Sequence, residues 1–271
     1  MGERSKLINV TTSILLFVIV FVLWQIYDII ILQVDLSLLF TQLLYLSIPG
    51  ISLVAFVLFI ILKDSSFKGQ GYKRTVAISS SKCLLLSCLF VVMYIFITLA
   101  QGIFGNFGTT TFPTEPYQLI FRLALAVVFG VASESVFRGY IFRNLVRNYG
   151  FFSSLYISSL LFSLHDISLT TILAMNTHDI IMYIFTMIIP AFAAGIFLGF
   201  YFYKIGWSLL GPITFRIIWL FFLLPLPIMS VSSPWWIALT FELLAFVALI
   251  FIVESIIKEP LVRRRRYGLE G

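Results

Sequence analysis

The chain has 271 residues, of which 61% are hydrophobic and only 11% are charged; the net charge is +6 and the mean hydropathy is +1.06. A soluble globular domain carries about a quarter charged residues, so this composition excludes one, and the modest Gly, Pro and Cys contents exclude collagen-like, disordered and disulfide-rich chains. The sequence therefore predicts an integral membrane protein with room for about eight helical spans of about 20 residues each.

Long apolar runs separated by polar segments predict an all-α, polytopic bundle. In chain order the eight predicted spans are 7–30, 38–62, 76–100, 117–147, 151–170, 179–203, 206–229 and 234–257. The fourth span is unusually long, and its second half, from Glu134 onward, is more polar than the first. No internal repeat or linker divides the chain, so we expect one membrane domain over 1–271.

The distribution of basic residues predicts which side of the membrane each loop faces. If the N-terminus is cytoplasmic, the segments 31–37, 101–116, 171–178 and 230–233 face the opposite side, and they contain no Lys or Arg. Of the 18 basic residues, Lys82, Arg122 and Arg216 fall inside spans, and Arg138, Arg143 and Arg147 lie in the more polar, cytoplasmic half of span four; the other 12 lie in cytoplasmic segments. Because Lys and Arg concentrate in cytoplasmic loops, we expect a multi-pass protein of the cell membrane with both termini in the cytoplasm.

The C-terminal segment 258–271 is strongly basic and contains four consecutive arginines, Arg263–Arg266. A juxtamembrane basic cluster attracts anionic lipid headgroups by about 1 kcal/mol per charge near the surface. We therefore expect this tail to contact membrane lipid and to fix the orientation of the chain. Nothing else in the sequence favours nucleic acid as a partner.

Four ionisable side chains fall at unusual depth in or beside the predicted spans, where such groups are costly and often functional. At 1.5 Å per residue, Glu134 lies about 20 Å before the end of span four, and His165 about 21 Å after the start of span five. Arg216 lies about 15 Å into span seven by the same rise. An antiparallel hairpin of spans four and five would bring Glu134 and His165 to similar depth, so these residues could share one polar pocket.

The fourth of these side chains is Arg138, which follows Glu134 by four residues, so the two lie on one helical face. An intrahelical ion pair keeps both residues charged in a medium of low dielectric constant. Two interpretations remain open from the residues alone: a structural ion network that includes Arg216, or part of a functional site.

Three segments resemble motifs of the CAAX-protease and bacteriocin-processing (CPBP/Abi) family of intramembrane glutamic proteases. Segment 133–143 is similar to its first motif, two adjacent glutamates followed after three residues by an arginine and usually Gly-Tyr-Leu/Ile-Phe. Segment 161–165 is similar to the second, Phe-x-x-x-His, with Leu161 in the Phe position. Segment 194–216 resembles a Gly-x-x-x-Gly helix, a basic turn and the approach to the third motif. The resemblance implies an eight-helix, protease-like core at about 117–230.

In active relatives, the resemblance implies that the first glutamate activates water, that the second-motif histidine assists, and that a third-motif His with an Asn or Asp stabilises the oxyanion. Glu134, Arg138 and His165 match this pattern. At the decisive positions Ser133 replaces the first glutamate, Arg216 replaces the third-motif histidine, and Leu220 replaces its Asn or Asp partner. A serine hydroxyl cannot deprotonate water near neutral pH, and an arginine cannot act as a base.

These departures favour a catalytically degenerate pseudoprotease that binds or scaffolds a membrane protein partner, its pocket held by Ser133, Arg138, Arg216 and Leu220. The alternative is an active intramembrane CAAX-type endopeptidase that cleaves membrane-associated or prenylated peptides, with Glu134 and His165 as catalytic residues. A Ser133–His165 nucleophile–base pair is a third reading by residue type; a transporter or electron-transfer subunit has little support.

No cofactor is expected from the sequence. Two His-Asp pairs, at His165 and His178, could bind a metal only weakly, because they lack the spacing of helical metal ligands. No metal site is therefore predicted.

Overall fold

A computed structural model describes residues 3–33, 38–62, 71–72, 80–101, 116–165, 167–223 and 235–257. The basic tail 258–271, most of the predicted loops and the part of span seven beyond residue 223 lie outside these described residues.

The described chain is helical throughout its regular segments, with no strand among them, which confirms the predicted all-α class. The α-helices are α1 (Glu3–Gln33), α2 (Leu38–Leu62), α3 (Ser80–Gln101), α4 (Pro116–Glu134), α5 (Arg143–Tyr149), α6 (Phe151–His165), α7 (Leu169–Ala174), α8 (Thr177–Tyr183), α9 (Ile189–Lys204), α10 (Leu210–Leu223) and α11 (Trp235–Ile256). Two π-helical stretches, η3 (Ser135–Phe142) and η4 (Ile184–Ile188), join α4 to α5 and α8 to α9.

Eight of the resulting helical segments are apolar. By length and composition, four can cross a membrane: Leu7–Ile26, Leu119–Tyr149, Thr177–Lys204 and Leu239–Ile256. Four shorter apolar helices accompany them in the described chain: Gly50–Ile61, Ser81–Met93, Phe151–His165 and Leu210–Phe221. Each falls within one of the eight predicted spans or overlaps it closely. The protein is therefore a helical membrane bundle.

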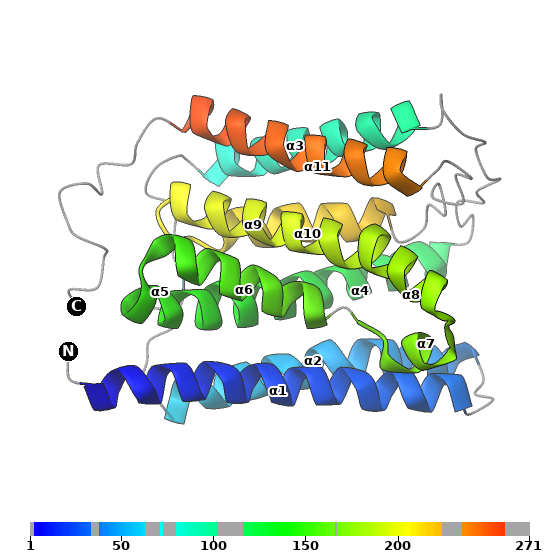
Figure 1. The fold of residues 1–271 in the computed structure, drawn as a ribbon, viewed down its shortest axis with the longest axis horizontal. Helices are drawn as coiled ribbons and strands as arrows, with labels where there is room; N and C mark the ends of the chain where they lie inside the picture. The colour runs from blue at the N-terminus through cyan, green and yellow to red at the C-terminus, as the bar shows by residue number, and fades with distance from the viewer. Residues whose placement is uncertain are drawn as a thin grey trace.

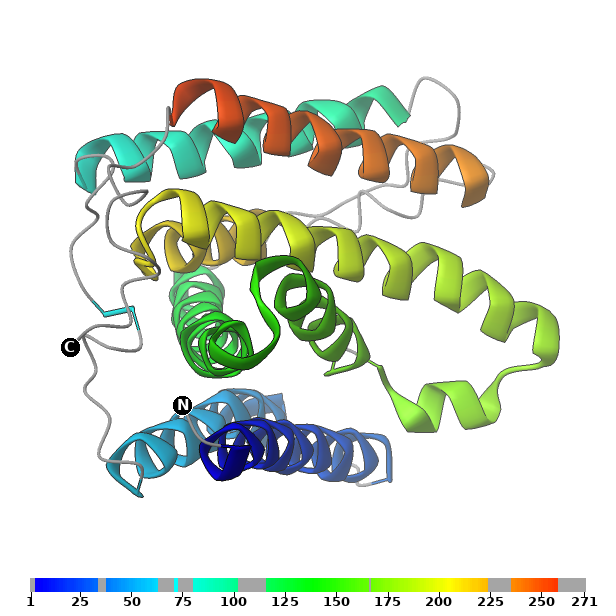
Figure 2. The ribbon, with the colours of Figure 1, turned by 60° about the vertical axis from the view of Figure 1, so that its left-hand side comes forward.

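The helices form three layers (Figure 1). Helices α1 and α2 make one outer layer and α3 and α11 the other, while α4, α6, α9 and α10 lie between them. Within this arrangement α6 packs on α9, α10 packs on both α4 and α3, and α2 packs on α4. Helix α1 begins and helix α11 ends at the end of the bundle that carries α5 (Figures 1 and 2). Among the described residues the layers enclose three hydrophobic cores: one around Phe197 and Phe215, one around Phe137 and Phe162, and one around Phe142 and Phe202.

The structure corrects the predicted boundaries around residues 166–178. Span five ends at His165 rather than residue 170, and a separate short helix, α7, follows it. The Ser168 hydroxyl accepts a hydrogen bond from the Thr171 amide at 3.1 Å and begins α7; Asn176 accepts one from the Asp179 amide at 3.0 Å and begins α8. Such side-chain acceptors satisfy amides that a helix start leaves free. The predicted loop 171–178 is therefore largely helical.

Span seven also begins later than predicted, because residues 205–209 form a turn. Gly206 and Trp207 both have positive φ, 80° and 62°. The Trp207 amide donates to the Phe202 carbonyl at 2.9 Å, which closes the end of α9. A positive φ is unusual for a bulky residue, and Trp207 is held there by packing against Phe142, Phe202 and Tyr203.

Helices α6 and α9 approach closely at the predicted Gly-x-x-x-Gly motif. A Cβ atom added to Gly195 would lie 2.9 Å from the Cβ and 3.0 Å from the Cα of Ser159. One turn later, a Cβ on Gly199 would overlap the Leu155 side chain. Small residues at this spacing let helix backbones approach one another in membranes.

This contact gives a first prediction. Gly195→Ala is expected to destabilise the fold by about 1–3 kcal/mol, because the added methyl group overpacks against the backbone of Ser159. The matched control is Gly50→Ala on α2, where nothing lies within 4 Å of the new Cβ; it is expected to leave stability unchanged or to raise it by about 0.5–1 kcal/mol. Thermal unfolding in detergent measures both. An unchanged melting temperature for Gly195→Ala would contradict the close approach.

Candidate functional site

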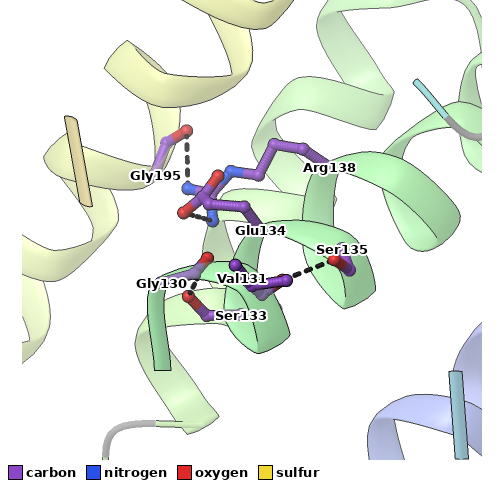
Figure 3. Close-up of polar contacts among 7 residues, drawn as sticks. All are labelled: Gly130, Val131, Ser133, Glu134, Ser135, Arg138 and Gly195. Carbon is purple, nitrogen blue, oxygen red and sulfur yellow. Dashed lines mark hydrogen bonds and ion pairs between the residues drawn. The ribbon is translucent and has the colours of Figure 1, made fainter. Parts of the chain in front are cut away.

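The first-motif region of the chain holds a buried ion pair. Glu134 is fully buried at the end of α4, and its Oε1 accepts a hydrogen bond from Arg138 Nη1 at 3.2 Å. Arg138 Nη2 donates to the Gly195 carbonyl on α9 at 3.3 Å (Figure 3). The close packing of Gly195 against α6 thus also places its carbonyl within reach of the guanidinium. The predicted Glu134–Arg138 pair is present and joins α4 and η3 to α9.

Phe162 connects this pair to the third-motif region. The Arg138 guanidinium carbon lies 4.1 Å from the centroid of the Phe162 ring, and that of Arg216 lies 5.0 Å from the same ring. Arg216 also lies 4.6 Å from the Trp219 ring. Guanidinium groups over aromatic faces are attracted by the ring quadrupole. The structure therefore brings α10 close to the Glu134–Arg138 pair, because both arginines contact the Phe162 ring of α6.

The helix changes its geometry directly after Glu134. Residues 135–142 are π-helical, and all eight side chains are buried. Within this stretch the Ser135 hydroxyl hydrogen-bonds the Val131 carbonyl and the Tyr72 hydroxyl. Tyr72 belongs to the segment that connects α2 to α3 in the sequence. Burial raises the pKa of its hydroxyl, and the hydrogen bond to Ser135 opposes part of that rise. π-Helical segments within α-helices are rare and frequent at functional sites.

A small, mostly apolar pocket lies on another side of the same helix, among α1, α2, α4, η3 and α6. Its described lining residues are Val20, Trp24, Ser52, Phe129, Ala132, Ser133, Val136, Phe137 and His165. The His165 ring lies between aromatic neighbours, 5.5 Å from the Trp24 ring and 5.4 Å from the Phe137 ring between centroids. The Ser133 hydroxyl donates to the Gly130 carbonyl at a long 3.5 Å. Ser133 and His165 thus both line the pocket; Glu134, for which the depth arithmetic predicts a pocket shared with His165, is not among its described lining residues.

The Gln25 side chain, which follows Trp24 in sequence, hydrogen-bonds the backbone just after His165. Gln25 Nε2 donates to the Ile167 carbonyl at 2.6 Å, and Gln25 Oε1 accepts from the Leu169 amide at 2.9 Å. These bonds fasten the start of α7 to α1, beside the pocket. The sequence contains no local signal for this clasp, because the bonded residues are more than 140 positions apart.

The predicted site residues therefore fall into two groups. Ser133 and His165 line the pocket, whereas Glu134, Arg138 and Arg216 gather around Phe162 and are not among the pocket's described lining residues. Figure 3 shows the division: Glu134 and Arg138 extend together toward Gly195, while Ser133 turns back to Gly130. Leu220 follows Arg216 by one turn of α10 and supplies no polar group.

A comparison with known protein families gives one match in the middle of the chain. Residues 115–222 match the family model described as Rce1-like, type II CAAX prenyl endopeptidase Rce1-like. This part of the chain is similar to the Rce1-like family. The match spans α4 to α10 and includes Ser133, Glu134, His165 and Arg216. No curated protein matches the chain.

Within the Rce1-like segment, two of the motif positions line the pocket, Ser133 and His165, whereas Arg216 and Leu220 are not among its described lining residues. Ser133 stands at the first-motif position and faces the pocket with His165. Glu134, which does match the motif, is engaged by Arg138. In the described part of the chain, no three His, Cys, Asp or Glu side chains lie close enough together to hold a metal ion.

The buried ion pair gives a second prediction. Glu134→Gln and Arg138→Met, made singly, are each expected to destabilise the protein by about 3–5 kcal/mol, because each leaves a buried charge without its partner. The double variant is expected to cost much less than the sum. Unfolding followed by tryptophan fluorescence in detergent measures the cycle. The control is Glu254→Gln, whose ion pair with Lys204 has a half-exposed carboxylate and is worth about 0–1 kcal/mol. Additive losses would contradict the pairing.

Proposed function

We propose that this Rce1-like protein is a catalytically degenerate membrane pseudoprotease that binds a membrane protein partner through the Ser133–His165 pocket. The observation that carries the proposal is the composition of that pocket: its nine described lining residues include no carboxylate. General-base activation of water by the family's route needs a carboxylate within hydrogen-bond reach of the water, and Ser133 cannot supply one.

The state of Glu134 supports the same proposal. It is the one carboxylate beside Ser133, and it is fully buried and bonded to Arg138, which in turn bonds Gly195. A guanidinium at this distance favours the charged carboxylate and weakens it as a base. The pair also closes a contact between two helices, so releasing Glu134 for chemistry would unpair a buried charge.

The lining of the pocket suits a partner that presents apolar side chains. Trp24, Phe129, Val136 and Phe137 supply most of its surface, with the His165 ring and two serine hydroxyls as polar groups. An apolar pocket with a few polar groups is the usual form of a binding site. A transmembrane segment or a membrane-bound peptide provides the complementary surface. The proposal places the protein in the cell membrane with both termini cytoplasmic, in keeping with the charge segregation of the sequence and with the common end of the bundle at which α1 begins and α11 ends.

Site-specific photo-crosslinking tests partner binding. A photoreactive phenylalanine analogue at Phe129, which lines the pocket, is expected to give a defined adduct with a membrane protein in native membranes. The same analogue at Phe96, an exposed side chain on α3, controls for contact with bulk membrane proteins. Ala132→Leu fills the pocket and is expected to abolish the Phe129 adduct. Equal labelling from both positions, or an adduct that Ala132→Leu leaves intact, would contradict the proposal.

A proteolysis assay tests the alternative function, an active CAAX-type endopeptidase. The observation that favours this alternative is that Ser133 and His165 line the same pocket. The purified protein, reconstituted with prenylated and unprenylated peptides, is expected to show no cleavage above that of the His165→Ala variant. Reproducible cleavage that Glu134→Ala or Ser133→Ala abolishes, with the melting temperature preserved, would instead establish an enzyme and identify its catalytic residue.

A further inference from the structure

Two arginines at the end of the long fourth span have no acidic partner among the residues that the structure describes. Arg143 and Arg147 lie on successive turns of α5, four residues apart, so both extend from one helical face. Arg143 is 7% exposed and Arg147 is half-buried. Two like charges at this spacing repel one another. Their juxtaposition therefore needs a compensating group.

The described chain provides no such group. Arg143 Nη1 and Arg147 Nε are shielded from solvent and have no hydrogen-bond acceptor among the described residues. The contact the structure gives Arg143 is the Trp207 ring, 5.7 Å from its guanidinium carbon. Lys204, at the same end of the bundle, is by contrast paired with Glu254 at 2.5 Å. Buried charges are normally paired or hydrogen-bonded, so the two arginines form an unsatisfied cationic site.

The turn that carries Trp207 shapes one wall of this site. Trp207 is held at a positive φ, a conformation that bulky residues rarely adopt, and its indole packs on Phe142 beside Arg143. The Leu209 amide donates to the Gly71 carbonyl at 2.9 Å, which fixes the far end of the same turn. This side of the site is therefore apolar, and the backbone of its turn is fixed at both ends.

The depth of the site matches the lipid headgroup layer. The apolar span ends at Tyr149, so Arg147 and Arg143 lie about 3 Å and 9 Å inside that end at 1.5 Å per residue. The headgroup region adds about 5–8 Å to each side of the hydrocarbon core. Tyr149 and Phe152, both exposed, lie beside the arginines where aromatic side chains mark a membrane interface. Long arginine side chains reach such an interface from within the core.

We propose that Arg143 and Arg147 form a binding site for a phosphate group at the end of the bundle that carries α5. A guanidinium presents paired N–H donors that match two phosphate oxygens, and one phosphate between the two arginines would satisfy both charges. The phosphate can belong to an anionic phospholipid headgroup or to a soluble phosphate. The site lies apart from the Ser133–His165 pocket and does not depend on the function proposed for it.

The test uses the full chain in dodecyl maltoside, which contains no phosphate. Phosphatidylglycerol in mixed micelles, inorganic phosphate and diacylglycerol are added in separate arms, and thermal shift and native mass spectrometry report binding. Phosphatidylglycerol is expected to raise the melting temperature and to remain as a bound adduct, whereas diacylglycerol, with the same tails and no phosphate, is not. A rise with inorganic phosphate alone would support the site with a soluble source. No response to either phosphate source would overturn it.

Variants assign the binding to the two arginines. Arg147→Gln, at the half-buried position, is expected to weaken phosphatidylglycerol retention about tenfold, and Arg143→Gln at least as much. Arg143→Lys keeps the charge without the paired donors, and an intermediate loss is expected if Arg143→Gln does not fold. The control Lys82→Gln on α3 removes one charge in the outer layer formed by α3 and α11. Equal weakening in this control, or wild-type retention in Arg147→Gln, would overturn the proposal.

Discussion

The fold depends on one buried contact, the salt bridge of Glu134 and Arg138 together with the bond from Arg138 to the Gly195 carbonyl. In a medium of low dielectric constant such a pair is stable only while all its members are in place. It ties the fourth span to α9, and the Phe162 ring, shared by Arg138 and Arg216, adds α6 and α10 to the same junction. Four helices of the middle layer therefore meet at a set of charges that has little freedom to take part in chemistry.

In the first-motif region, neighbouring residues therefore face different surroundings: one belongs to the ion pair and the other lines the pocket. Glu134 faces the junction, while its neighbour Ser133 faces the pocket with His165. A change at position 133 alters the pocket without breaking the ion pair, so the composition of the pocket and the stability of the fold are physically separable in this chain. Such a separation suits the binding role proposed above.

The sequence predicts the features that depend on local periodicity. Hydropathy locates the eight apolar segments, the four-residue spacing predicts the Glu134–Arg138 pair, and the helical rise predicts that span five returns His165 to the depth of the first motif. Features that depend on distant contacts are not predictable in this way. Two such features arise from packing between helices far apart in the chain. They are the contact of the Phe162 ring with two arginines and the hydrogen bonds of Gln25 to the backbone of residues 167 and 169. The helix starts at Ser168 and Asn176 could have been predicted from the sequence, since serine and asparagine are favoured N-cap residues. The π-helical geometry after Glu134 has no comparable signature.

The π-helical turns of residues 135–142 also store surplus chain length. Each of their hydrogen-bonded rings encloses one residue more than an α-helical ring does, so the stretch contains more residues for its height. Loss of a single residue there can be absorbed by tightening to α-helix, with the overall reach of the span preserved. The same loss in α4 or α5 would shorten the span and turn everything beyond it about the helix axis. The segment in which a one-residue deletion changes the helix length least therefore follows Glu134 directly and contains Arg138.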